Sequence, residues 1–133
     1  MKKLIILFIF CILLCSGFKF NRGIILFNKQ PITEQTALYN SKVFNAGEKV
    51  YYLFIAPKRM KNEYIRIQIF KMTDKAPWGG NEVRRTKDVR LMKDEKYYHT
   101  DYFVLYEKGR YVMQVFSTDD FQHPLSIGDF YVK

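Results

Sequence analysis

The chain has 133 residues, which is enough to bury one hydrophobic core and the usual size of a single domain. It holds 22 Lys and Arg against 13 Asp and Glu, a net charge of +9, but the cations are scattered among acids as on an ordinary soluble surface, and we expect no nucleic-acid partner. Both cysteines, Cys11 and Cys15, lie near the N-terminus, which excludes disulfide or thiolate chemistry in the rest of the chain.

Residues 1–17 have the layout of a secretory signal peptide. Lys2 and Lys3 form a short positive region, and residues 4–14 (LIILFIFCILL) are an unbroken apolar stretch. A membrane-spanning helix needs about 20 apolar residues, and this run ends earlier, at Ser16 and Gly17. We therefore expect export from a bacterial cytoplasm, followed by a single domain over residues 18–133.

Three fates of this N-terminal segment stay open. Cleavage after Gly17 would release a soluble domain into the periplasm. Residues 12–16 (ILLCS) also resemble a bacterial lipoprotein box, which implies a leader of residues 1–14 and a lipidated Cys15. An uncleaved segment would anchor the domain in the membrane. All three predict an extracytoplasmic domain, either in the periplasm or tethered to the cell envelope.

The first half of the domain contains four expected strands. Three are short, at residues 23–27 (GIILF), 37–39 and 43–44. The fourth, at residues 50–55 (VYYLFI), is apolar on both faces. This is typical of a central strand covered on both sides, or of one whose outer face carries aromatic residues for contact. Pro57 then ends it, because proline cannot donate to a β-ladder.

The middle of the chain combines the clearest strand with the most ambiguous stretch. Residues 64–72 (YIRIQIFKM) alternate, with Ile65, Ile67 and Ile69 on one face. Residues 73–96 open with a turn that contains Gly and Pro and continue as a charged segment. We interpret this stretch as a loop followed by one or two short edge strands, because charge discourages pairing between sheet edges.

The last third of the chain predicts three strands. Residues 102–106 and 111–117 flank Gly109, whose freedom to adopt a positive φ suits a tight connection, and this is the strongest hairpin signal in the chain. The final strand covers residues 129–133 (DFYVK). Roughly seven to nine short strands without helices between them predict an all-β fold, a sandwich of two antiparallel sheets.

From residue 43 onward the order of parts resembles an immunoglobulin-like or fibronectin type III-like sandwich. Residues 105–115 (LYEKGRYVMQV) are similar to the L-x-x-x-G-x-Y-x-h-x-h run, where h is hydrophobic, through which such domains enter their penultimate strand. Residues 43–50 (VFNAGEKV) look like the turn before an early core strand. The resemblance implies an immunoglobulin-like sandwich without the antibody-type cysteine pair. Members of this superfold mostly bind, space or assemble other molecules.

The residues that could carry catalysis are few. The serines after residue 17 are Ser41, Ser117 and Ser126, and none lies in a G-x-S-x-G context. We therefore expect no catalytic residue, no cofactor and no enzyme activity. His99 and Asp101 are two residues apart on an expected strand and would share a face, which makes them weak candidates for a divalent metal. The other clustered groups are Asp119, Asp120 and His123.

Aromatic and basic side chains are the better candidates for contact with other molecules. Tyrosine is enriched at interfaces because it joins an apolar ring to a polar tip, and a small core cannot bury every tyrosine of this chain. The alternative is that coding bias raises Tyr, Phe, Ile, Lys and Asn together. The aromatic interaction candidates are Tyr51, Tyr52, Tyr64, Trp78, Tyr97 and Tyr98. The basic candidates are Arg84, Arg85 and Arg90.

These features favour a non-catalytic protein-interaction or assembly module of the bacterial cell envelope, with another envelope protein as partner. The alternative is a binding module for an anionic glycan or lipid head group, which would use residues 84–96 together with Trp78. A metal-dependent enzyme at His99 and Asp101 is the third hypothesis.

Overall fold

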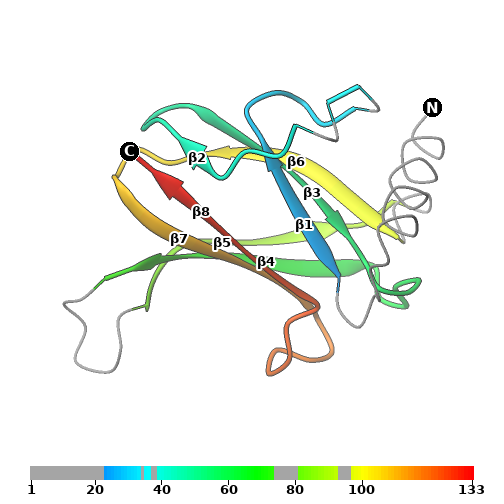
Figure 1. The fold of residues 1–133 in the computed structure, drawn as a ribbon. Helices are drawn as coiled ribbons and strands as arrows, with labels where there is room; N and C mark the ends of the chain where they lie inside the picture. The colour runs from blue at the N-terminus through cyan, green and yellow to red at the C-terminus, as the bar shows by residue number, and fades with distance from the viewer. Residues whose placement is uncertain (1–22, 34, 37–38, 74–80, 93–96) are drawn as a thin grey trace.

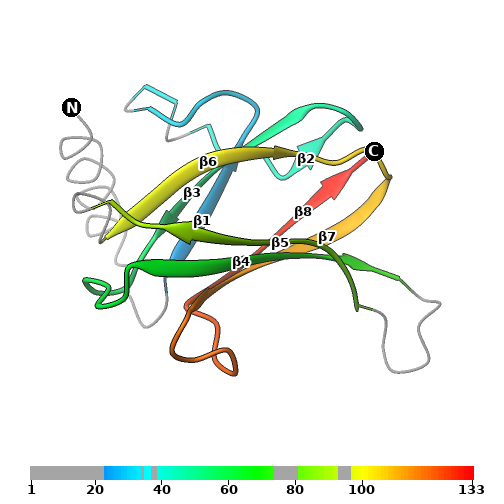
Figure 2. The same ribbon diagram turned by 180° about the vertical axis from the view of Figure 1, so that it is seen from behind.

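Eight β-strands in two layers form the regular structure of the described residues (Figures 1 and 2). The computed structural model describes residues 23–133 apart from 34, 37–38, 74–80 and 93–96. The expected leader, with Cys15, and Trp78 lie outside this part of the chain. Of the weak strand expected at residues 37–39, only Tyr39 is described, and it is not in a strand.

The first layer is a three-stranded sheet in the order β1-β3-β6. It consists of β1 (Ile24–Asn28), β3 (Lys49–Ile55) and β6 (Tyr98–Val104), and all its pairs are antiparallel. β3 is the central strand, as its apolar sequence predicts. Its inner face packs in the core, and on its outer face Leu53 and Ile55 are also buried, outside the main core cluster.

The second layer is a five-stranded sheet in the order β2-β8-β7-β4-β5. Its strands are β2 (Val43–Phe44), β4 (Tyr64–Met72), β5 (Asn81–Arg90), β7 (Gly109–Ser117) and β8 (Ser126–Val132). The expectation of purely antiparallel sheets is wrong at one place, because β2 pairs with β8 in parallel. Phe44 explains this arrangement. It is fully buried and packs edge-on against Phe130, so the chain runs along β8 after it leaves the first layer.

The hairpin expected around Gly109 is also wrong. β6 and β7 belong to different sheets, so residues 105–108 carry the chain from one layer to the other (Figure 1). Gly109 does have a positive φ, of 151°. Leu105 is buried in the core at this crossing, and the hydroxyl of Tyr111 donates a hydrogen bond to the carbonyl of Glu107 at 2.6 Å. These two contacts fix a corner between the sheets, and burial of Leu105 there stabilises it.

The charged stretch before β6 forms a single long strand where one or two short ones were expected. β5 pairs antiparallel with β4 along that strand's whole length and lies at the edge of the five-stranded sheet. The register between the two strands shifts at Ile69 and Phe70 of β4, which marks an irregularity of the β-bulge type. The edge position and the high charge agree with the expectation from the sequence.

The core between the layers is built around aromatic rings. Phe130 contacts Phe27, Phe103 and Tyr111, with ring centroids 5.0, 5.4 and 5.5 Å apart. Antibody domains have a tyrosine near the start of the strand that corresponds to β7, and a disulfide-forming cysteine two residues after it. In this chain the tyrosine is Tyr111, and the position of the cysteine is taken by the buried Met113. Aromatic packing therefore takes the place of a disulfide between the sheets.

The strand order confirms the immunoglobulin-like resemblance at the level of the fold. In immunoglobulin nomenclature, β1, β3 and β6 correspond to strands A, B and E, and β8, β7, β4 and β5 correspond to G, F, C and C′. Tyr111 lies at the start of F with its hydroxyl bonded to the backbone four residues upstream, the arrangement known as a tyrosine corner. The described part of the chain is an all-β, two-layer sandwich with this topology.

Candidate functional site

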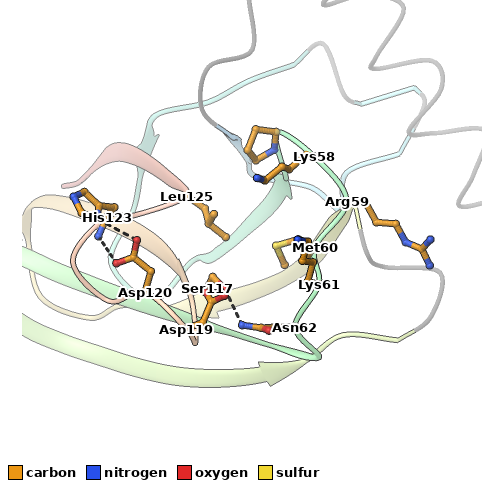
Figure 3. Close-up of a pocket in the computed structure, with 11 residues that line it drawn as sticks. Lys58, Arg59, Met60, Lys61, Asn62, Ser117, Asp119, Asp120, His123 and Leu125 are labelled. Carbon is orange, nitrogen blue, oxygen red and sulfur yellow. Dashed lines mark hydrogen bonds and ion pairs between the residues drawn. The ribbon is translucent and has the colours of Figure 1, made fainter.

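A pocket of about 280 Å³ lies at one end of the sandwich, between the loop joining β3 to β4 and the loop joining β7 to β8 (Figure 3). These are the loops that correspond to two of the binding loops of antibody variable domains. Met60 and Leu125 supply apolar lining, and the other lining residues are polar or charged apart from Pro57. The pocket is slightly smaller than the usual range of small-molecule sites, which begins at about 300 Å³.

One wall of the pocket contains a serine, a histidine and two aspartates, but their hydrogen bonds do not form a catalytic arrangement. The hydroxyl of Ser117 donates to Asp119 and accepts from Asn62. The ring of His123 pairs with Asp120 at 3.1 Å. Backbone N–H groups of Gln122 and His123, together with that ring, hold the pKa of Asp120 below its ordinary value. The hydrogen bonds of Ser117 and His123 thus do not link a nucleophile to a base.

The opposite wall carries three cations, Lys58, Arg59 and Lys61, which the sequence interpretation did not single out. Within the described part of the chain, none of them has an ion pair, and Arg59 points away from the loop between β7 and β8 (Figure 3). The run KRMK was the available signal, but three exposed cations in a loop are common on soluble surfaces.

The weak metal candidates His99 and Asp101 both lie on β6. His99 is buried with its ring 5.8 Å from that of Tyr52, whereas Asp101 is half-buried and pairs with Lys87 at 3.4 Å. Asp119, Asp120 and His123 lie in the loop at the end of the sandwich, beside Ser117. In the ranges that the structure describes, no three His, Cys, Asp or Glu side chains are grouped closely enough to hold a metal ion.

The basic candidates on β5 are engaged with neighbouring acids and carbonyls. Arg84 pairs with Glu82 and Glu107, and Arg90 pairs with Glu63. Arg85 donates to the backbone carbonyl of Val104 on β6, at 2.9 Å. The three arginines therefore do not form an unpaired cationic patch, and one of them links the edges of the two sheets.

The aromatic candidates divide into buried and exposed residues. Tyr52 and Tyr98 are only 3% and 4% exposed, so the structure corrects their assignment as surface contacts. The alternating pattern missed this because β3 is apolar on both faces and the start of β6 is buried. Tyr64 and Tyr97 are exposed, but they lie apart, at the start of β4 and just before β6. The expectation that a small core cannot bury all these tyrosines is confirmed.

Tyr51 is the candidate around which a surface cluster forms. It lies directly opposite Tyr102 on the outer face of the three-stranded sheet, with ring centroids 5.5 Å apart. The ammonium group of Lys49 lies 4.8 Å from the centre of the Tyr102 ring, and Tyr102 is 47% exposed. We call Lys49, Tyr51 and Tyr102 the tyrosine face. Lys49 and Tyr102 were not among the predicted site residues, because only the register of β3 on β6 brings them together.

Comparison with known proteins adds no family. No family model matches the chain, and no curated protein matches it. Among solved structures, it is similar to the PmoD soluble domain from Methylocystis sp. ATCC 49242, with 14% identity, a TM-score of 0.46 and coverage of 87% of this chain and 94% of that one. An immunoglobulin-like protein from Pseudomonas aeruginosa gives 15% identity and a TM-score of 0.47, covering 83% and 92%.

A β-glucosidase from Listeria innocua is also similar, with 14% identity and a TM-score of 0.42 over 83% of this chain but 16% of that one. Likenesses this distant carry no argument about function. The described part of the chain contains no helix that is long and apolar enough to cross a membrane.

Proposed function

We propose that this protein is a non-catalytic protein-interaction module of the bacterial cell envelope and that it contacts another envelope protein through the tyrosine face. The observation that carries the proposal is the pairing of Tyr51 with Tyr102 on the outer face of a sheet, with Lys49 over one of the rings. Tyrosine is enriched at the centres of binding surfaces, whereas lysine is depleted there, so the two rings carry the argument and Lys49 does not.

The backbone that carries Tyr51 is held rigidly in the sheet, which favours binding. Tyr51 lies on the central strand of its sheet, between β1 and β6, so backbone pairing on both sides holds its position. A tyrosine has only two side-chain torsions to fix, and contact between the two rings already restricts them. A partner would therefore gain apolar contact area and a hydrogen-bonding rim at a small entropic cost.

The location in the envelope is proposed from the signal-like residues 1–17. The non-catalytic role is proposed from the sequence, and in the loop pocket Ser117 and His123 bond to different aspartates. Both agree with a module whose role is contact. The resemblance of the sandwich to domains that bind or assemble other molecules is consistent with this role and does not by itself assign it.

The experiment is co-purification from membranes after mild cross-linking, with the full chain and a double variant, Tyr51→Ser with Tyr102→Ser. We expect a stoichiometric partner protein with the unmodified chain and a loss of at least about tenfold with the double variant, since interface tyrosines often contribute 2 kcal/mol or more each. Tyr131→Ser is the matched control, because Tyr131 is similarly exposed but lies on β8 in the other sheet. A clean monomer without a partner would contradict the proposal.

A further inference from the structure

Three buried side chains lie on the outer face of the three-stranded sheet, away from the core between the layers. Leu53 and Ile55 are two residues apart on β3, and Ile55 lies directly opposite Tyr98 of β6, so all three share this face. They are only 2%, 2% and 4% exposed, and none of them belongs to the core cluster. On β1, Ile24 lies opposite Ile55 and extends the apolar surface. We call these four residues the outer patch.

The strands and neighbouring loops of the described chain do not account for this burial. Tyr52 and Phe54 alternate along β3 with the patch residues and belong to the core cluster, on the side where the five-stranded sheet lies (Figures 1 and 2). Ala56, Met60 and Leu91, buried in the loops beside this end of the sheet, belong to the same core cluster. The outer patch therefore needs a cover from elsewhere in the chain.

The described chain begins directly beside the outer patch. The N–H of Gly23 donates to the carbonyl of Leu125 at 2.8 Å, and the hydroxyl of Ser126 donates to the carbonyl of Gly23 at 2.6 Å. A Cβ added at Gly23 would lie 2.7 Å from the carbonyl oxygen of Ile55, so the backbone of residue 23 passes close against the end of β3. The preceding residues therefore start from the end of the sheet that carries the patch.

Residues 18–22 (FKFNR) suit the outer patch in their pattern. In an extended chain Phe18 and Phe20 share one side, whereas Lys19 and Asn21 share the other. Such a segment can bury one side on apolar surface and keep its polar side in water. This alternation is typical of a half-buried extended segment.

The segment is also long enough. Five extended residues span up to about 17 Å. The outer patch extends only about 7 Å along β3, and about 5 Å separates β3 from each neighbouring strand. Residues 18–22 can therefore turn back from Gly23 and reach every residue of the patch.

The leader is a poorer cover for the patch. Residues 4–14 are apolar on every side, which suits the export machinery or a membrane and not a surface that leaves one side in water. Residues 18–22, in contrast, stay with the domain in all three fates expected of the N-terminal segment.

We propose that residues 18–22 fold back over the outer patch, with Phe18 and Phe20 against its apolar side chains and Lys19 in solvent. The inference goes beyond the proposed function and does not depend on a partner at the tyrosine face. Tyr51 is two residues from Leu53 on β3, so the docked segment would hold Phe18 within about 15 Å of the tyrosine face. A lipidated Cys15 would then place the tyrosine face beside the membrane.

The first test is photo-cross-linking within the full chain. A benzoylphenylalanine takes the place of Phe20, and mass spectrometry of the digested protein maps the product. We expect an intramolecular cross-link to β3, at Leu53 or Ile55. The matched control carries the same group in place of Lys19, on the opposite side of the segment, and should give at least about tenfold less of this product. Equal yields at the two positions, or no cross-link to β3 from position 20, would overturn the proposal.

A third position tests the leader as the alternative occupant. The same photoreactive group in place of Phe8 lies in the middle of residues 4–14. We expect no cross-link from position 8 to β3. A cross-link to β3 from position 8 and none from position 20 would show that the leader covers the outer patch, and the proposal would be wrong.

The accessibility of β3 gives a second, independent measurement. Leu53→Cys provides the probe, in a full chain in which Cys11→Ser and Cys15→Ser leave it as the single thiol. We expect Phe18→Ser together with Phe20→Ser to raise the rate of thiol labelling by about tenfold or more, because the cover over the patch is lost.

The control for this measurement is the pair Lys19→Ser with Asn21→Ser, which changes the polar side of the same segment. We expect it to leave the labelling rate unchanged, with melting curves to verify that each variant is folded. An unchanged rate in the folded phenylalanine variant, or an equal rise in both variants, would contradict docking of residues 18–22.

Discussion

Tyr111 holds the corner between the two sheets through a single hydroxyl group. Its side chain is buried, stacked on Phe130, and burial raises the pKa of the phenol above its ordinary value, so the hydroxyl stays a donor to the carbonyl of Glu107. Tyr111→Phe keeps the ring and removes the bond, and we expect the free energy of unfolding in urea to fall by about 1 kcal/mol. Tyr106→Phe, at an exposed tyrosine of the same corner, should change it very little.

Glu107 makes the stability of the same corner depend on pH. Hydrogen bonding from Lys71, with Arg84 nearby, holds the pKa of Glu107 below the ordinary 4.5. A carboxylate whose pKa is lowered by folding contributes stability above the unfolded pKa and loses it as the pH falls through the folded value. Glu107→Gln should therefore flatten the loss of stability below about pH 4.5, as followed by urea unfolding at a series of pH values. Curves that stay parallel to those of the unmodified protein would contradict this assignment.

At the scale of the elements, two substitutions in β2 test why this strand pairs in parallel with β8. Phe44 is fully buried against Phe130, whereas Val43, its neighbour in the same two-residue strand, is 44% exposed. We expect Phe44→Ala to lower the free energy of unfolding by about 3–5 kcal/mol and Val43→Ala to change it by less than about 0.5 kcal/mol. Equal effects of the two substitutions would show that burial of Phe44 does not hold β2 in place.

The elements also show how far local sequence patterns reach. The alternation of Ile65, Ile67 and Ile69 predicts β4 correctly, because a strand with one buried face has a period of two. The position of Gly109 between two strand-like runs predicted a hairpin, but the chain changes sheets there. The choice depends on burial of Leu105 and on the bond made by Tyr111, which are tertiary contacts. The single long β5 was missed because its charges suit any exposed edge, and its length is set by β4.

At the scale of the whole molecule, the sequence predicts an all-β sandwich of the right strand number and an immunoglobulin-like motif at its penultimate strand. It identifies Tyr51 as a contact residue but not the partners Tyr102 and Lys49, because cross-strand register is not readable from one chain. Tyr52 and Tyr98 were assigned to the surface because composition cannot tell which tyrosines a fold buries.

Site-specific photo-cross-linking in intact cells tests the central claim most directly. The full chain would carry a benzoylphenylalanine in place of Tyr102 or, as the matched control, in place of Tyr131 on the other sheet. We predict one discrete cross-linked protein product from position 102 and none from position 131. The absence of a product at position 102, or the same product from both positions, would contradict the tyrosine face as the site of contact.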